Sequence, residues 1–401
     1  MSTSSDSTNK WYLLSLATAT MTFAAAMPFS CMPVLFREIS NDLHLSLAQI
    51  GVVWGMVGLA GVFVSLIAGV LGDKLGVRLV LGLVCLLGGF VGASRGMSVD
   101  FVSLALTVFA FGILRGILPI NVHKATSLYF RGSNLGTANG VVSMGMGVGL
   151  MLGSMLSAAI LSPLLGGWRR VLFLYGAASI ALGALWLLSL RTPSDSKSRP
   201  VTVPILGAIK KLVRIKSVWL IGLTLMFRMG CIMGMTGYLP LYLRGRGWEA
   251  VAADSVLAGF YAVSALSVIP ISLLSDRIGS RKAILLAASI MTIFGIGLVP
   301  IVNDTLVWVL VLATGVFMDA FMAVSVTLAQ QIEGVGSEYS GTALGLAFTL
   351  SQVGGFLSPL LGNSLAVLDS GLPLLFWASL SLCAVIPLLL INEPIKGTQS
   401  V

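Results

Sequence analysis

The stretch GVLGDKLGVR, residues 69–78, ends a long apolar run with three glycines and a cluster of charge. A second stretch, SLLSDRIGSR, residues 272–281, repeats the arrangement later in the chain. Asp276, Gly279 and Arg281 each lie 203 residues after Asp73, Gly76 and Arg78, and Gly315 has the same offset from Gly112. This repeat predicts two related halves whose substrate site lies where they meet.

The composition indicates an integral membrane protein. Of the 401 residues, 57% are hydrophobic and 10% are charged, and the mean hydropathy is +0.99. A soluble domain has about 25% charged residues, so this chain lacks the polar surface to face water. We therefore expect its surroundings to be a lipid bilayer.

Apolar segments long enough to cross a membrane recur along the whole chain. A spanning helix needs about 20 predominantly apolar residues, and helices satisfy their own backbone hydrogen bonds in lipid. The sequence predicts an all-α protein with twelve transmembrane helices in two pseudo-symmetric six-helix bundles. The expected spans are 11–36, 48–71, 79–97, 101–123, 136–163, 170–190, 217–243, 254–274, 283–302, 305–329, 341–366 and 372–391.

Lysine and arginine are distributed unevenly between the two sides. With the N-terminus inside, fifteen of them fall in the inner connections and six, Arg95 among them, in the outer ones. This bias predicts a multi-pass protein of the cell (inner) membrane with both termini in the cytoplasm. It also accounts for the net charge of +9 without a nucleic-acid partner.

The longest polar connection divides the chain into six spans and six. We expect an N-terminal bundle at 1–190, a cytoplasmic linker at 191–216 and a C-terminal bundle at 217–401, in a monomeric protein. Residues 205–215 fit equally a short helix on the inner leaflet and a plain solvated linker.

The two loops resemble the signature G-x-L-x-D-[KR]-x-G-x-R of the major facilitator superfamily, although Ser272 replaces the first glycine of the second copy. That resemblance implies two bundles that rock about a central site, with the loops acting as a conformational latch on the cytoplasmic side. An alternative is that Lys74 and Arg78 only set the topology. The expected latch residues are Gly69, Asp73, Lys74, Gly76, Arg78, Asp276, Arg277, Gly279 and Arg281.

Three further stretches look like cyanate-permease-type and related anion transporters: residues 112–130, 144–153 and 237–248. The glycine-rich signatures of nitrate transporters are missing, and so is the fifth-span signature of drug antiporters. The fifth span instead carries a ladder of Gly145, Gly149 and Gly153, which predicts close helix packing.

Three ionisable residues are expected in the middle of spans, where such residues usually mark a transport pathway. Arg115 and Arg228 are candidate substrate-binding residues, because guanidinium groups suit carboxylates and other anions. Asp319 is a candidate for proton coupling or gating and for pairing with either arginine. Two arginines against one aspartate leave a positive charge, which predicts an anionic substrate. The alternative is a structural ion pair with the other arginine reaching water.

Other polar and aromatic residues in the spans are weaker candidates. Asn121, Tyr238 and Gln352 are expected to contribute polar groups to the substrate cavity, and Phe29 an aromatic wall. His123 and Gln330 are candidates for gating beside Asp319. For each of these six residues a packing role is the competing interpretation.

The sequence excludes several classes of chemistry. No G-x-x-x-x-G-K-[ST] motif occurs, and the four cysteines and two histidines form no metal-binding pattern. We therefore expect no enzyme activity, no cofactor and no bound metal, but a secondary transporter that moves a small organic or inorganic anion by alternating access. A proton is the candidate coupling ion, in symport. The alternatives are a proton-coupled multidrug exporter and, from another class, a receptor or scaffold, which the short loops disfavour.

Overall fold

The computed structural model describes residues 3–65, 68–130, 133–189, 212–330 and 336–391, and these residues form helices and no strands. Eleven described helices, counted with their continuations, are long and apolar enough to cross a membrane. The twelfth predicted span corresponds to α13 (Arg281–Gly297), which has 17 residues and is about 26 Å long at 1.5 Å per residue. The predicted all-α membrane fold is confirmed.

The chain folds into two compact units, each built from segments that are distant in sequence. Unit 1 comprises Met1–Ser46, Phe63–Arg199 and Leu243–Tyr261, and unit 2 comprises Leu47–Val62, Pro200–Tyr242 and Ala262–Val401. The predicted domain boundaries at 190 and 217 remain a prediction. The segment 205–215 lies largely outside the described residues.

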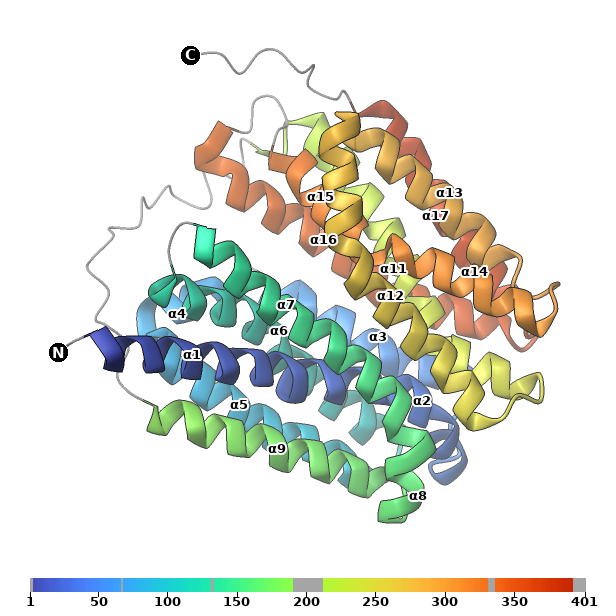
Figure 1. Ribbon diagram of the computed structural model, residues 1–401. Coiled ribbons are helices and arrows are strands. Elements are labelled where there is room, and N and C mark those ends of the chain that lie inside the picture. The colour runs from blue at the N-terminus through green and yellow to red at the C-terminus, as the bar shows by residue number, and fades with distance from the viewer. Residues whose placement is uncertain (1–2, 66–67, 131–132, 190–211, 331–335, 392–401) are drawn as a thin grey trace. The chain divides into compact units, whose positions relative to one another are not determined.

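Unit 1 is a bundle whose helices α1, α5, α6, α7 and α9 run alongside one another (Figure 1). Its first span changes hydrogen-bonding register along its length, from α-helix to π-helix and back, a feature often found at functional sites. The elements of this unit are α1 (Thr3–Ala19), the π-helix η1 (Thr20–Ala26), α2 (Met27–Asp42), α4 (Ala68–Leu75), α5 (Val77–Ser94), the 3-10 turn η2 (Arg95–Met97), α6 (Phe101–Tyr129), α7 (Ser133–Leu156), the π-helix η3 (Ser157–Leu161), α8 (Ser162–Leu165) and α9 (Trp168–Leu188).

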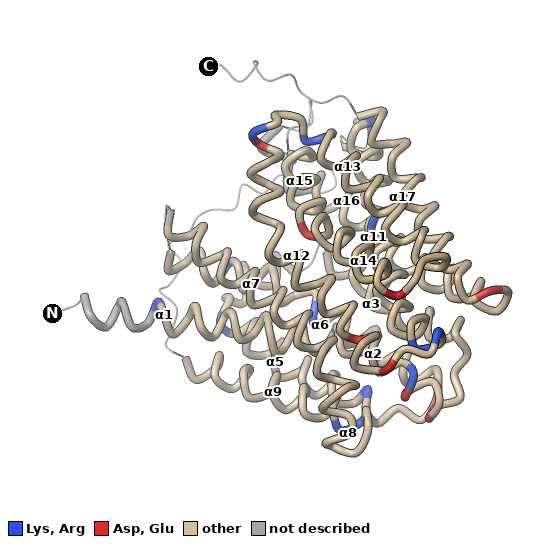
Figure 2. The backbone as a smooth tube through the Cα atoms, turned by 45° about the vertical axis from the view of Figure 1, so that its right-hand side comes forward, with Lys and Arg blue, Asp and Glu red and all other residues tan. Residues whose placement is uncertain are grey.

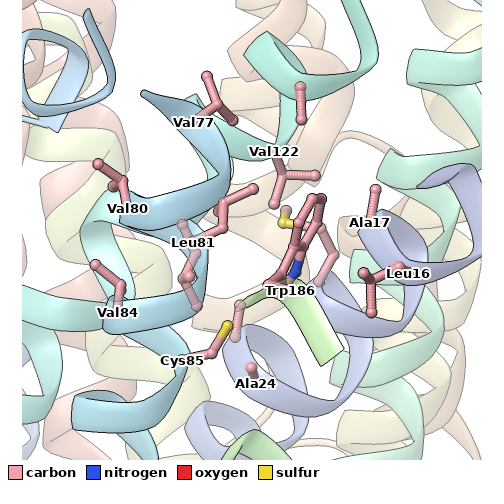
Figure 3. Packing of buried hydrophobic residues seen from close by; sticks show 14 of the residues in the cluster. Leu16, Ala17, Ala24, Val77, Val80, Leu81, Val84, Cys85, Val122 and Trp186 are labelled. Atoms are coloured by element: carbon pink, nitrogen blue, oxygen red, sulfur yellow. The ribbon is translucent and has the colours of Figure 1, made fainter. Parts of the chain in front are cut away.

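The core of unit 1 gathers around Trp186 of α9. Aliphatic side chains of neighbouring helices pack around its indole ring, Leu81 of α5 and Val122 of α6 among them (Figure 3). The indole N–H donates to the Thr20 hydroxyl over 2.8 Å, so the polar atom of a buried tryptophan is satisfied. Burial of the ring and this hydrogen bond together fix α9 against the π-helical part of the first span.

The glycine ladder of α7 packs against the first span as expected. A Cβ atom on Gly149 would lie 2.6 Å from the Cβ of Ala26 and 2.8 Å from the carbonyl oxygen of Thr22. Gly145 and Gly153 are equally close to the same span. Because only glycine permits this approach, the ladder sets the distance between α7 and the first span.

A capping box marks the start of α6. The backbone N–H of Ser103 donates to the carboxylate of Asp100 over 2.8 Å, and the Ser103 hydroxyl accepts from the backbone N–H of Asp100 over 3.2 Å. Hydrogen bonds from the Ser103 side chain and backbone lower the pKa of the Asp100 carboxyl. The cap fixes the depth at which residues of α6, including Arg115, are presented.

Unit 2 contains most of the remaining helices. The predicted continuous span 305–329 is divided at Phe317, whose backbone N–H donates to the carbonyl of Thr314 over 3.3 Å in a tight turn. The elements of unit 2 are α3 (Leu47–Val64), α11 (Lys216–Gly245), α12 (Ala250–Ile278), α13, α14 (Asp304–Val316), α15 (Met318–Gln330), α16 (Gly336–Leu365) and α17 (Leu372–Leu390). Part of the length of α3, α11 and α12 belongs to unit 1.

Candidate functional site

Charged residues lie mainly near the ends of the helices, and few lie along their middle parts (Figure 2). Arg115 lies fourteen residues after the start of α6, and Arg228 lies twelve residues after the start of α11. At 1.5 Å per residue these positions are about 21 Å and 18 Å along their helices. Both guanidinium groups are therefore held far from the helix ends.

Arg115 contacts the first span of unit 1. Its Nε donates to the carbonyl oxygen of Ala25, in the π-helix η1, over 3.0 Å. Its guanidinium carbon lies 3.9 Å from the centre of the Phe29 ring, which is cation–π geometry. The structure thus brings together two predicted site residues, Arg115 and Phe29, and adds a backbone carbonyl that the sequence did not indicate.

Arg228 is buried inside unit 2, with 4% of its surface exposed. One terminal nitrogen donates to the hydroxyl of Thr292 on α13, and the guanidinium carbon lies 4.8 Å from the centre of the Phe321 ring on α15. The other terminal nitrogen, Nη2, is buried and has no hydrogen-bond partner among the described residues. A buried donor on a charged group that is left unpaired is costly, so this nitrogen is a position where an acceptor would be favourable.

Asp319 lies in the first turn of α15, immediately after the break at Phe317. Its carboxylate accepts a hydrogen bond from the Ser264 hydroxyl of α12 over 2.6 Å, and its backbone N–H donates to the same hydroxyl over 3.1 Å. Within the described residues of unit 2, no ion pair joins Asp319 to Arg228. A hydrogen bond to Ser264 takes the place of a pairing with Arg228, and the alternative pairing with Arg115 remains a prediction.

Two predicted polar residues of α6 hold neighbouring helices. Asn121 is fully buried, and its side-chain amide donates to the carbonyl of Ala68, the first residue of α4, over 3.0 Å. The Nδ1 atom of His123 lies 3.2 Å from the amide oxygen of Asn139 on α7. These contacts are those of packing residues, and the cavity role of Asn121 and the gating role of His123 remain predictions.

Two predicted residues of unit 2 also make packing contacts. The Tyr238 hydroxyl donates to the carbonyl of Ser370 over 3.0 Å, and its ring packs edge-on against Trp377. The Gln352 side chain lies directly against Gly61 of α3. Their roles in a substrate cavity remain predictions. The Gln330 side chain lies outside the described residues.

The signature loops share an unusual backbone geometry at equivalent positions. Gly76 has a φ of 83° and Gly279 a φ of 78°, a left-handed conformation that disfavours other residues. After the first loop, Arg78 donates to the carbonyls of Trp186, over 3.1 Å, and Leu187 at the end of α9. The glycines thus turn the chain sharply, and the arginine ties the following helix to α9.

The second signature loop makes an equivalent helix-to-helix contact, but through the residue after the signature arginine. Lys282 donates to the carbonyls of Leu389 and Ile391, at the end of α17, over 2.6 and 3.0 Å. Arg281 lies 3.5 Å from the carboxylate of Asp276 in an ion pair.

The remaining predicted latch residues lie in the same two loops. Lys74 and Arg277 are exposed, whereas the surroundings of Gly69 and of the Asp73 side chain fall outside the described part of the chain. The latch function of these loops remains a prediction.

A buried ion pair was missed from the sequence. One terminal nitrogen of Arg244, at the end of α11, lies 2.6 Å from each carboxylate oxygen of Asp254 in α12, and both side chains are almost completely buried. Hydropathy alone puts Arg244 in an outer loop and Asp254 at the edge of a span. The sequence does contain an indication of this ion pair, because two opposite charges flank a short glycine-containing turn.

Comparison with known proteins identifies the family. The family model described as the Major Facilitator Superfamily matches residues 18–359 and, in a second match, residues 247–399. The chain belongs to the Major Facilitator Superfamily. The resemblance inferred from the two signature loops is confirmed, and membership of this superfamily makes the chain a transporter and not an enzyme.

Individual relatives within the Major Facilitator Superfamily are distant. A probable nitrate/nitrite transporter of Mycobacterium tuberculosis is 27% identical over 66% of this chain and 67% of its own length. A probable nitrate transporter of Staphylococcus carnosus is 24% identical over 86% of this chain and 87% of its own. A crystal structure of a mutant of the nucleoside transporter NupG shares the fold, with a TM-score of 0.80, 14% identity and coverage of 94% of this chain and 99% of that one.

Proposed function

We propose that this protein is a secondary active transporter of a small anion, with nitrate and nitrite as the leading candidates. The observation that carries the proposal is the Arg228 guanidinium, which is buried in the middle of α11 with one nitrogen unpartnered. On insertion scales an arginine at the centre of a membrane helix costs about 2.5–3.5 kcal/mol, so such residues usually have a function.

The surroundings of Arg228 suit a transient anionic partner. The described contacts of Arg228 are the Thr292 hydroxyl and the Phe321 ring, neither of which is negatively charged. Its positive charge therefore has no carboxylate partner among the described residues of unit 2. A guanidinium presents a planar fork of donors that matches the planar oxygens of a carboxylate or of nitrate.

Arg115 has the same pattern in unit 1. It stacks on an aromatic ring, Phe29, and donates to a neutral oxygen, that of Ala25. In both units the aromatic ring holds the guanidinium in place while leaving its charge available. We assign both arginines to anion binding.

The relatives support an inorganic anion over a hydrophobic drug. Two proteins similar to this chain over about two thirds or more of its length are named as nitrate or nitrite transporters, although the sequence lacks the glycine-rich signatures expected of that group. A multidrug exporter would need no uncompensated arginine in a span. That alternative is therefore disfavoured.

Nitrate counterflow tests the proposal. Proteoliposomes that contain the purified protein and unlabelled nitrate should take up labelled nitrate faster than protein-free liposomes, and should not take up a hydrophobic cationic dye. Uptake of the dye without nitrate counterflow would support the exporter instead.

We further propose that Asp319 couples anion movement to a proton. It is a carboxylate in the middle part of a span, at the start of α15, where it accepts a hydrogen bond from the Ser264 hydroxyl. The break at Phe317 also provides a point at which α14 and α15 can move separately. The sequence suggested symport. The same carboxylate could couple the proton and the anion whether they move in the same direction or in opposite directions.

Replacing Asp319 with asparagine should separate transport from coupling. The amide cannot release a proton, so accumulation of nitrate driven by a pH gradient should fall to the level of protein-free liposomes, while nitrate counterflow continues. Asp100→Asn, on the surface at the start of α6, is the matched control. Asparagine caps a helix as well as aspartate does, so this variant preserves the position of α6 and should keep both activities. Accumulation that survives in Asp319→Asn would assign proton coupling elsewhere.

We place this multi-pass protein in the cell membrane as a monomer, with both termini in the cytoplasm. The excess of basic residues in the inner connections supports that orientation. In this orientation the two signature loops face the cytoplasm, where they would act as the latch between alternating states.

A further inference from the structure

Arg95 lies at a position for which the sequence predicted only a role in topology. The structure places its backbone in the turn η2, between α5 and α6, but only 1% of the residue is exposed. The side chain therefore reaches into unit 1 instead of out to the surface.

The contacts of Arg95 resemble those of Arg115. Its guanidinium carbon lies 3.9 Å from the centre of the Phe111 ring, and one terminal nitrogen donates to the carbonyl of Pro28 over 2.9 Å. Its Nε donates to the carbonyl of Gly92 over 3.0 Å. Each arginine thus combines an aromatic ring with a carbonyl of the first span.

The residues that anchor the two guanidinium groups are spaced by about one helical turn. On α6, Phe111 under Arg95 comes four residues before Arg115 itself. On the first span, the accepting carbonyls of Pro28 and Ala25 are three residues apart. Since one turn rises about 5.4 Å, both helices give the same short separation along their axes.

The charge of Arg95 is uncompensated. Its Nη2 atom is buried without a hydrogen-bond partner, and in the part of the chain that the structure describes no carboxylate forms an ion pair with it. Two neighbouring cations without an acidic partner would repel each other in a site of low polarity. A purely structural role would be served better by a neutral side chain of similar size.

We propose that Arg95 is a second anion-binding residue, which holds the transported anion one helical turn from Arg115, toward the end at which α6 begins. The proposal rests on the anion transport proposed above and extends the number of anion-binding sites in unit 1 from one to two. Its ligand class is a small oxyanion such as nitrate, whose oxygens can accept hydrogen bonds from the free Nη2. With two adjacent binding sites, the anion can leave one arginine while it is attracted by the next. Tight binding at one site then does not slow release of the anion.

The test uses Arg95→Gln in the purified full-length protein. Melting temperature is measured in detergent without nitrate and with increasing nitrate, with gluconate as the large control anion. For the wild type we expect nitrate, and not gluconate, to raise the melting temperature, because a ligand that binds only the folded state stabilises it. In Arg95→Gln we expect most of that rise to disappear, the nitrate-free melting temperature to stay the same or increase, and the KM for nitrate to rise about 10-fold or more.

Two further variants make the result decisive. Arg170→Gln removes an exposed arginine at the start of α9 that donates to the Leu165 carbonyl, and it should keep the full nitrate-dependent rise. Arg95→Lys keeps the charge but lacks the second terminal nitrogen, so it should fold even if Arg95→Gln does not. We expect the KM of Arg95→Lys for nitrate to increase about 5-fold or more, as a charge-assisted hydrogen bond is lost.

The outcomes distinguish this proposal from the transport function. If Arg95→Gln has a lower nitrate-free melting temperature but an intact nitrate-dependent rise, Arg95 has only a structural role and the proposal is overturned. An unchanged KM in Arg95→Lys, or a wild type that nitrate does not stabilise, would also overturn it, even if nitrate is transported. Nitrate stabilisation that requires Arg95, in a protein without nitrate counterflow, would keep the anion site and reject the transport function.

Discussion

Replacing Arg228 with glutamine is expected to slow nitrate uptake by a factor on the order of 100 while the protein remains folded. A charge-assisted hydrogen bond contributes about 1.5–3 kcal/mol, and each 1.4 kcal/mol corresponds to a factor of about 10. The glutamine also leaves the Thr292 hydroxyl and the Phe321 ring without the cation that they now contact. The loss should appear in the ratio kcat/KM for nitrate.

Two companion variants define what Arg228 contributes. Arg228→Lys keeps the charge but loses the planar fork, so its uptake should lie between those of the wild type and Arg228→Gln. Arg214→Gln removes an exposed arginine just before α11 and should transport normally. Wild-type uptake by Arg228→Gln, with Arg214→Gln equally active, would remove Arg228 from the substrate pathway.

The largest effect on stability is expected at Asp254. Its carboxylate and Arg244 form an ion pair with exposed fractions of 0% and 5%, and in the part of the chain that the structure describes the Nε of Arg244 has no hydrogen-bond partner. Removing one member of such a pair leaves a buried charge without compensation, which costs about 3–5 kcal/mol. Asp254→Leu alone and Arg244→Met alone should therefore each be strongly destabilised in reversible unfolding by denaturing detergent.

A double-mutant cycle provides the control. Replacing both residues with apolar ones, Arg244→Met and Asp254→Leu, should restore most of the lost stability, because neither charge remains. The exposed pair Arg169 and Asp42, which is 2.8 Å apart with 35% and 46% exposure, should show a coupling energy of about 0.2–1 kcal/mol in the same assay. Equal coupling energies for the two pairs would contradict the assigned importance of burial.

Hydropathy predicted the spans well because the bilayer restricts spanning segments to helices. The fourth expected span, 101–123, is the helix Phe101–Tyr129, which starts at the predicted residue and continues beyond the apolar part. Backbone hydrogen bonds do not require apolar side chains, so hydropathy underestimates how far a helix continues into the aqueous region. The two signature loops were identified for a different reason, namely that a repeated pattern of glycines and charges is rare by chance.

Features that depend on backbone register or on contacts between distant residues were not predictable. The π-helix at Thr20–Ala26 and the break at Phe317 have the same apolar composition as the regular helix around them. Arg95 was interpreted as a loop residue because a sequence does not show whether an arginine at a helix end turns outward or inward. The same limit applies to Asp319, whose partner Ser264 is 55 residues away in sequence.

Anion binding by Arg115 and Arg228 is tested by nitrate counterflow. The wild type and the double variant Arg115→Gln/Arg228→Gln are measured side by side at equal protein content. We expect saturable counterflow by the wild type and none above protein-free liposomes by the double variant. A double variant that exchanges nitrate at the wild-type rate would contradict the claim that these two arginines bind the transported anion.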